Sequence, residues 1–186
     1  MRIRAARWEH EAEAIGDALA RAFHDDPVIR WLLPDEKGTA AMFVALARHI
    51  HAVTDVAGDI SGDISGVAIW DPPGHRPDEE AGVPGLVAAM GDRVSYGITL
   101  DETMAGHRPE QPHWYLAQLG TVPELQGTGV GSALMREGLA RCDAPVYLES
   151  SKESNVPFYE KHGFRVTERF TLPDGPPVWG MWRPAP

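Results

Sequence analysis

Three glycines alternate with other residues in the stretch LQGTGVGSAL, at positions 125–134. Ordering glycine is entropically costly, so glycine at every second position indicates that the backbone itself is used there. Residues with helical spacing follow. Backbone N–H groups at the start of a helix form a ready anion-binding site, because the dipole is positive there and the first N–H groups have no helical partner. We therefore expect a phosphate-bearing ligand at this loop.

Two other phosphate-binding motifs fit this loop less well. A P-loop ends in Gly-Lys followed by Ser or Thr, whereas this loop ends in Gly131-Ser132. The dinucleotide fingerprint is G-x-G-x-x-G directly after a strand, whereas here the order is G-x-G-x-G and residues 122–126 intervene. Glu149 lies about where a ribose-binding acid belongs, but the 55 residues after Gly131 are too few for the rest of a doubly wound domain.

The elements around the loop follow from hydrophobic spacing. Residues 113–122 form an apolar stretch typical of a strand, 132–142 a helix, and 145–150 a buried strand. Strand, loop, helix and strand make a βαβ unit, which implies a parallel strand pair. A short helix at 155–164, stopped by Gly163, then leads into a hairpin around the turn PDGPP.

The N-terminal half is predicted to begin with helices. Apolar residues from Trp8 to Phe23 recur at three- and four-residue steps, typical of an amphipathic helix, and the HDDP break at 24–27 ends it. A short helix at 28–35 and a further helix capped by Thr39 follow. The next predicted segments are a strand that ends at Gly58, a glycine-rich turn, a strand at 67–70, a loop at 71–85 and two short helices within 86–106.

Length and composition limit the class of protein. A chain of 186 residues is long enough for one domain with a real core, and we expect a single domain over 1–186. A net charge of −10 argues against nucleic-acid binding and suits a small cationic partner. The lone Cys142 excludes an internal disulfide, and the eight histidines lack metal-ligand spacing, so we expect no metal. With no signal-type or membrane-spanning apolar run, we expect a cytoplasmic protein without membrane contact.

Three stretches carry a family resemblance: QGTGVG (126–131), VYLESSKESNVPFYEKHGFRVT (146–167) and LPDGPPVWGMWRP (172–184). The first resembles the Q/R-x-x-G-x-G/A signature of the GCN5-related N-acetyltransferases (GNAT), whose loop holds the pyrophosphate of acetyl-CoA. Together they resemble puromycin N-acetyltransferase and its relatives over most of 107–184, whereas 71–105 carries no resemblance. The implied fold is α/β, with a mixed, splayed central β-sheet flanked by helices.

The resemblance also implies where the cofactor binds. In this family the strand before the loop pairs with the pantetheine arm, the loop wraps the pyrophosphate, and an asparagine contacts the arm. The corresponding cofactor-binding residues here are Leu119, Gly120, Thr121, Gln126, Gly127, Thr128, Gly129, Val130, Gly131, Ser132 and Asn155. Close relatives often have a basic residue inside the loop, where this chain has Thr128, so one charge-assisted contact is missing.

Acetyl transfer to an amine requires a base and an acid. The amine must lose a proton before it attacks the thioester, and CoA leaves more easily as a thiol. Tyr159 lies where a tyrosine commonly reaches the thioester sulfur, so the resemblance implies that it is the acid. Glu149, at the end of a strand, is expected to be either the base or the anchor of the amine. An N–H near Leu119 or Gly120 would stabilise the oxyanion.

We therefore expect an N-acetyltransferase that uses acetyl-CoA as co-substrate and acetylates a small-molecule amine by direct attack in a ternary complex. Asp25 and Asp26, in the HDDP break, are expected to attract a cationic acceptor. Acetylation of a protein N-terminus or lysine, and a non-catalytic acyl-CoA-binding module, stay open as alternatives. The acceptor itself, puromycin included, and the choice between monomer and homodimer stay open too.

Overall fold

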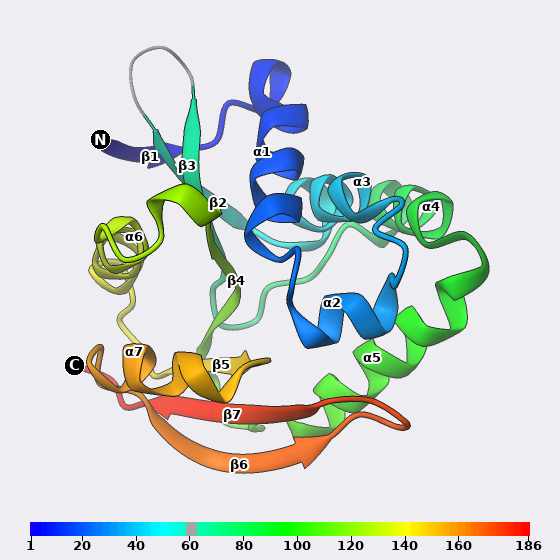
Figure 1. Ribbon diagram of the computed structural model, residues 1–186. Helices are drawn as coiled ribbons and strands as arrows, with labels where there is room; N and C mark the ends of the chain where they lie inside the picture. Colours follow the sequence, from blue (N-terminus) through cyan, green and yellow to red (C-terminus); the bar gives the residue numbers. More distant parts are fainter. Residues whose placement is uncertain (59–62) are drawn as a thin grey trace.

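A seven-stranded sheet runs through the centre of the molecule in the order β1-β2-β3-β4-β5-β7-β6 (Figure 1). The computed structural model describes residues 1–58 and 63–186. Its strands are β1 (Arg2–Ala5), β2 (Val53–Gly58), β3 (Ile64–Asp71), β4 (Trp114–Thr121), β5 (Val146–Ser150), β6 (Arg165–Thr171) and β7 (Pro177–Arg183). All neighbours are antiparallel except β4 and β5, which are parallel as the βαβ pattern predicts. The mixed sheet confirms the predicted fold class.

The parallel pair β4 and β5 separates soon after it begins. Only Trp114 with Val146 and Tyr115 with Tyr147 are paired, so the following halves of both strands diverge. On its other edge β4 stays paired with β3 up to Thr121, with a bulge near Ala117 where the register shifts. One edge of β4 is thereby left without a strand partner along its second half, which confirms the predicted splay.

Helices cover both faces of the sheet. They are α1 (Trp8–Ala22), α2 (Pro27–Leu32), α3 (Thr39–Ala45), α4 (Glu79–Met90), α5 (Val94–His107), α6 (Val130–Leu139) and α7 (Val156–Glu160). In Figure 1, α6 lies on one side of β3 and β4, and α1 and α3 lie on the other. The N-terminal helices bury one apolar cluster around Phe43 and Ile69, and α6 buries a second around Trp70 and Leu134. No helix in residues 1–58 and 63–186 is long and apolar enough to span a bilayer.

Most boundaries of the C-terminal half agree with prediction. Helix α6 begins at Val130, two residues earlier than expected, and ends at Leu139. Helix α7 is shorter than predicted, and Gly163 has the positive φ of +89° that suits a glycine after a helix. The hairpin of β6 and β7 forms around the predicted turn.

In the N-terminal half two predictions need correction and one strand was missed. Residues 79–85 are helical and not loop, because Asp78 accepts the N–H of Ala81 as a cap, which offsets the hydrogen bond that Pro84 forfeits inside α4. Thr39 is not the cap of α3: Gly38 holds that position with φ of +76°. Strand β1, which pairs with β2, was not predicted. Part of the predicted glycine-rich turn lies outside the described residues.

Candidate active site

A cleft of ≈ 680 Å³ opens where β4 and β5 diverge. Most residues predicted to bind cofactor or acceptor or to catalyse line it, although they come from five separate segments of the chain. These are Asp26, Leu119, Gly120, Thr121, Gln126, Gly127, Gly129, Gly131, Ser132, Glu149, Asn155 and Tyr159. Asp25, Thr128 and Val130 are the predicted residues that do not line it.

The glycine loop has the geometry of a backbone anion site. Gly127 and Gly129 have φ of +76° and +95°, and the space where a Cβ would lie is empty at both. The N–H of Ala133 donates to the carbonyl of Gly129 (3.0 Å) at the start of α6. The N–H groups of the three residues between them, 130–132, precede that bond and have no helical carbonyl to pair with. They mark the end of α6 at which an anion is favoured.

Two predicted loop residues use their side chains for structure. The Thr128 hydroxyl donates to the carbonyl of Leu125 (2.7 Å), which closes the turn. The Val130 side chain is buried in the core cluster below α6. Both residues are expected to bind through their backbone and not through their side chains. The Thr128 N–H donates to the carbonyl of Leu125 (3.3 Å), whereas the Val130 N–H, at the start of α6, has no helical carbonyl to pair with.

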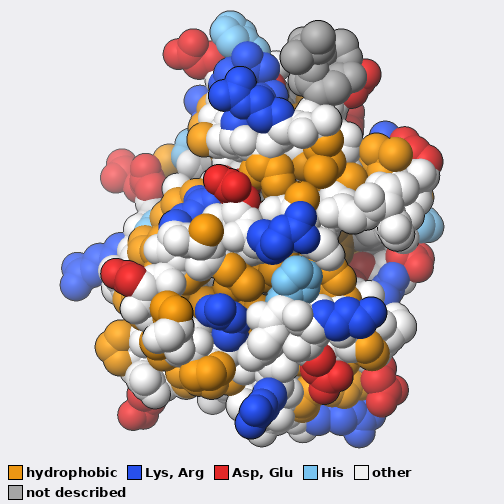
Figure 2. Space-filling model, turned by 90° about the vertical axis from the view of Figure 1, so that its left-hand side faces the viewer, with side chains coloured by type: hydrophobic (Ala, Val, Ile, Leu, Met, Phe, Trp, Pro, Cys, Tyr) orange, Lys and Arg blue, Asp and Glu red, His pale blue; other side chains and the backbone are white. Residues whose placement is uncertain are grey.

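Lys161 and His162, which were not singled out in the sequence, line the cleft opposite the loop. His162 Nε2 lies 3.4 Å from Ser132 Oγ, in the first turn of α6. Burial and the positive charges of Arg136 and Arg183 lower the pKa of His162. Figure 2 looks onto this side of the molecule, where Lys, Arg and His side chains lie among apolar ones. In a chain of net charge −10, this end of the cleft is locally cationic.

Tyr159 is held by its ring and has a free hydroxyl. The ring packs edge-on against Phe158 and Phe164, with centroids 5.3 and 6.1 Å away. No hydrogen bond to the hydroxyl is found within residues 1–58 and 63–186. Burial, and next the negative charge of Asp26, raise the pKa of Tyr159, so the phenol keeps its proton at neutral pH. It can donate that proton to a group bound in the cleft.

Glu149 is almost wholly buried, with 4% of its side chain exposed. Burial raises its pKa, and the guanidinium of Arg108 and the phenol of Tyr115 oppose this by favouring the charged form. Arg108 Nε lies 3.6 Å from Glu149 Oε1. Neither atom has a hydrogen-bond partner in the described structure, nor do the buried Gln118 Oε1 and Tyr147 hydroxyl. Of these residues, Gln118 and Glu149 line the cleft, so their unpaired oxygens can accept hydrogen bonds there.

The acidic pair before α2 is already engaged. Asp26 Oδ1 accepts the N–H groups of Val28 and Ile29 (3.0 Å each), which caps α2, and its Oδ2 accepts the hydroxyl of Ser151. Asp25 pairs with Lys152 at 2.6 Å. Both contacts join the turn before α2 to the segment after β5, so they cross between the two diverging halves of the sheet. Acceptor binding by Asp25 and Asp26 stays a prediction.

Comparison with known proteins gives the family. Residues 85–166 match the profile of the acetyltransferase (GNAT) domain. A crystal structure from Corynebacterium glutamicum, described as histone acetyltransferase HPA2 and related acetyltransferase, is 32% identical, with a TM-score of 0.77 over 99% of this chain and 96% of that one. The chain belongs to the GNAT acetyltransferases.

Two further proteins have lower sequence identity to this chain. An uncharacterized N-acetyltransferase of Schizosaccharomyces pombe is 27% identical over 88% of this chain and 72% of its own. An aminoglycoside 6'-N-acetyltransferase solved with coenzyme A shares the fold, with a TM-score of 0.62 and 13% identity over 99% and 97% of the two chains.

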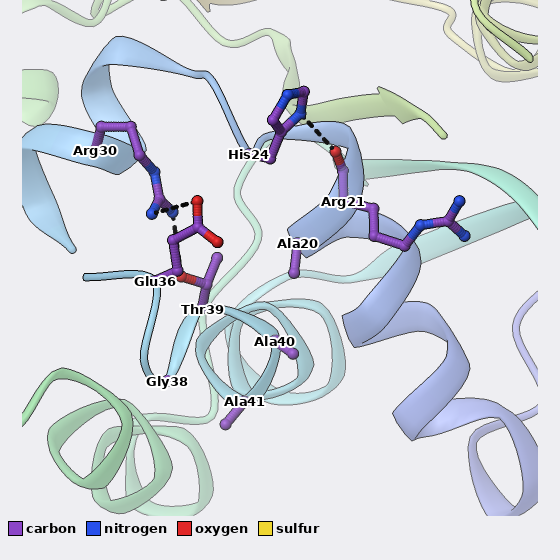
Figure 3. A pocket seen from close by; sticks show the side chains of 9 residues that line it. All are labelled: Ala20, Arg21, His24, Arg30, Glu36, Gly38, Thr39, Ala40 and Ala41. Carbon is purple, nitrogen blue, oxygen red and sulfur yellow. Dashed lines mark hydrogen bonds and ion pairs between the residues drawn. The ribbon is translucent and has the colours of Figure 1, made fainter. Parts of the chain in front are cut away.

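The second cavity of this GNAT chain, of ≈ 430 Å³, lies between α1, α2 and the start of α3 (Figure 3). Its cations are paired with carboxylates. Arg30 lies 3.3 Å from Glu36 and also donates to Thr39, and Arg21 pairs with Glu124 at 2.5 Å. Figure 3 shows the Arg30 side chain turned toward Glu36 and the His24 ring toward the Arg21 carbonyl. The loop, Tyr159 and Glu149 all lie in the other cleft.

Proposed function

We propose that the chain transfers the acetyl group of acetyl-CoA to the amine of a small molecule, by direct attack within a ternary complex. The observation that carries the proposal is the cleft between β4 and β5. It brings an anion-binding loop, a proton-donating phenol and a buried carboxylate to one place. Membership of the GNAT acetyltransferases supports the same chemistry.

The cofactor has a consistent path through this cleft. The free N–H groups at the start of α6 would bind the pyrophosphate, with Lys161 and His162 facing it. The pantetheine arm would then run along residues 119–121, where the edge of β4 facing β5 has no strand partner. Its amides can pair with that backbone, as a strand would. Asn155, at the mouth of the cleft, would contact the arm.

In the proposed reaction, Glu149, a backbone N–H of β4 and Tyr159 each have one role. Glu149 takes a proton from the acceptor ammonium, directly or through water, and the neutral nitrogen attacks the thioester carbonyl. An N–H of Leu119 or Gly120 stabilises the oxyanion. When the carbon–sulfur bond breaks, Tyr159 donates its proton to the sulfur, so CoA leaves as a thiol. Because Arg108 already balances the charge of Glu149, the carboxylate suits a base better than the anchor of a permanent cation.

The contacts over the cleft favour a small acceptor. The Asp26–Ser151 hydrogen bond and the Asp25–Lys152 ion pair cross the gap between the two halves of the sheet, whereas a peptide needs a groove open at both ends. A second candidate is acetylation of a protein, because the relative from Corynebacterium glutamicum is described as a histone acetyltransferase.

Release of free thiol from acetyl-CoA tests the proposal against both alternatives. The panel contains small amines, puromycin included, and peptides with a free N-terminus or lysine. We expect release with at least one small amine and little with peptides. Release only with peptides would establish the second candidate, and acetyl-CoA binding without release for any amine would indicate a non-catalytic module.

Tyr159→Phe tests the acid. The substitution removes the proton and keeps the packed ring, so we expect turnover to fall by roughly 10²–10⁴-fold with acetyl-CoA affinity little changed. Phe158→Leu, which alters a neighbouring ring without a hydroxyl, is the packing control. Turnover of folded Tyr159→Phe within about twofold of the parent, with chemistry rate-limiting, would show that another group protonates the sulfur.

A further inference from the structure

Arg108 reaches the Glu149 carboxylate from the end of a helix whose residues are at most partly buried. It directly follows α5, a helix without a single buried residue. Its side chain nevertheless turns inward and is about two-thirds buried, with 35% exposed. The guanidinium carbon lies 4.0 Å from the centre of the Tyr115 ring, and Nε lies 3.6 Å from Glu149 Oε1. The inward turn of one charged side chain at the end of a solvated helix calls for a specific reason.

The end of α5 is fixed to the β6–β7 hairpin by the preceding residue. The His107 ring stacks on Phe170, with centroids 3.8 Å apart and planes 6° from parallel. Its Nδ1 lies 2.9 Å from Glu168 Oε1. These two contacts fix the end of α5 to β6. Strand β6 pairs with β7, and β7 pairs with β5, the strand that carries Glu149.

Arg108 and Glu149 form an ion pair in which one donor atom and one acceptor atom make no hydrogen bond. Both Nε and Oε1 are buried without a hydrogen-bond partner, although they face each other. A direct hydrogen bond between them would occupy the carboxylate oxygen, and without any cation the buried carboxylate would take up a proton. At 3.6 Å, Arg108 favours the charge of Glu149 and leaves Oε1 open.

We propose that Arg108 is a positioning residue, which keeps Glu149 ionised and its Oε1 free to receive a proton from the acceptor. The identity of that proton rests on the proposed function, whereas the control of ionisation does not. The other titratable groups around Glu149 are Tyr115 on β4 and Tyr147 on β5. Asp101 on α5 acts on Arg108, and Glu168 on β6 acts on Tyr147.

The expected change in the pKa of Glu149 on loss of Arg108 follows from two opposing influences on that pKa. Burial raises its pKa and Arg108 lowers it. Loss of the positive charge should raise the pKa further. Because a base acts only above its pKa, the acid limb of the profile of kcat/KM against pH should move to higher pH.

The experiment compares the intact protein with Arg108→Gln, Arg108→Lys and the control Arg76→Gln, which alters an exposed arginine in the loop after β3. The Glu149 carboxyl is titrated by carbon-13 NMR in the free enzyme, and kcat/KM is measured across pH. For Arg108→Gln we expect both midpoints to rise by about one unit or more, the usual effect of one nearby opposite charge. In Arg108→Lys, which keeps the positive charge, both midpoints should lie close to those of the parent. Arg76→Gln should match the parent.

The two readouts separate this inference from the proposed function. An unchanged carboxyl midpoint in folded Arg108→Gln would overturn the inference. A raised carboxyl midpoint with an unmoved rate profile would support it and remove Glu149 as the base. If Arg108→Gln does not fold, Arg108→Lys is compared with a second neutral variant, Arg108→Met. A lower Glu149 carboxyl midpoint in Arg108→Lys than in Arg108→Met supports control by the positive charge. Equal midpoints in the two variants contradict it.

Discussion

We expect Lys161, which lines the cleft beside His162, to supply a positive charge that the glycine loop lacks. Thr128 occupies the place where related loops carry a basic residue, and its hydroxyl is used within the turn. The missing charge is available from across the cleft, because the end of α7 packs against the first turn of α6 through His162 and Ser132. Lys161 can thus replace the missing cation, provided that its side chain and the loop reach the same phosphate.

Lys161→Gln is therefore expected to weaken CoA binding. Charge-assisted contacts to phosphate are each worth about 1.5–3 kcal/mol, so we expect a loss of roughly 10–100-fold. Calorimetry at several salt concentrations should also show a shallower salt dependence. Lys37→Gln, in the exposed turn before α3, is the control. An unchanged affinity for CoA in folded Lys161→Gln would show that the backbone alone binds the phosphates.

The position of a residue in the cleft was predictable where a short motif within one segment of the chain indicates it. The glycine positions and Tyr159 follow from short motifs, and both lie in the cleft. Arg108 was missed because its role depends on Glu149, which only the sheet brings near. The acidity of Asp26 is visible in the sequence, whereas the hydrogen bonds that its oxygens accept are visible only in the fold. Its contact with an acceptor stays a prediction.

Glu11 connects the first helix to the first strand. Its residue is 5% exposed, and it accepts from Arg4 Nη1 (2.8 Å), from the backbone N–H of Arg7 (2.8 Å) and from Arg7 Nη2 (2.7 Å). The Arg4 guanidinium, more than the Arg7 contacts, lowers the pKa of Glu11 to about 2. The carboxylate thereby fixes the start of α1, which otherwise has no side-chain cap.

The ionisation of Glu11 gives a pH-dependent contribution to stability. Since the folded pKa is depressed, the contribution is present above the unfolded value near 4.5 and is lost as pH falls toward 2. Glu11→Gln should lower the free energy of unfolding by about 1–3 kcal/mol at pH 7. The difference from the parent should shrink below pH 4.5 in urea titrations. Glu13→Gln, exposed on the same helix, should behave as the parent at every pH; a constant Glu11→Gln difference would contradict the linkage.

Helices were predictable from the sequence where one of their faces is apolar and buried. Helices α1 and α6 bury Leu19 and Leu134 and were found by spacing. Helix α4 buries only Gly82, so its sequence has no apolar stripe, and Pro84 makes it resemble a loop. Strand β1 has only four residues, none fully buried, and it forms because β2 offers an edge.

Helices α4 and α5 are poorly buried. Val83 and Val87 on α4 are 44% and 46% exposed, and Ile98 on α5 is 54% exposed. Helix α5 is held by Tyr96 on Trp31, by His107 on Phe170, and by Leu100 and Met104, which are partly buried against the cluster around Phe170. Because no α5 residue is fully buried, whereas α6 buries Leu134 and Met135, packing stabilises α5 less than α6.

Hydrogen exchange should detect this difference. We expect amides in the middle of α5 to exchange at least about tenfold faster than those in α6, because opening α5 exposes little apolar surface. Mass spectrometry of peptic fragments at several times gives the comparison within one sample. Protection of α5 equal to that of α6 would mean that its side-chain contacts stabilise the whole helix.

The short pairing of β4 with β5 makes the two halves of the sheet depend on what fills the gap between them. Two residue pairs join β1 through β4 to β5 through β7 along the backbone. A pantetheine arm between the diverging strands would take the place of the missing ladder, so the co-substrate would act as a temporary eighth strand. By mass action, a ligand at a hundred times its Kd adds about 2.7 kcal/mol to the stability of the form that binds it. The heat tolerance of this protein in a cell would then rise and fall with the supply of acetyl-CoA.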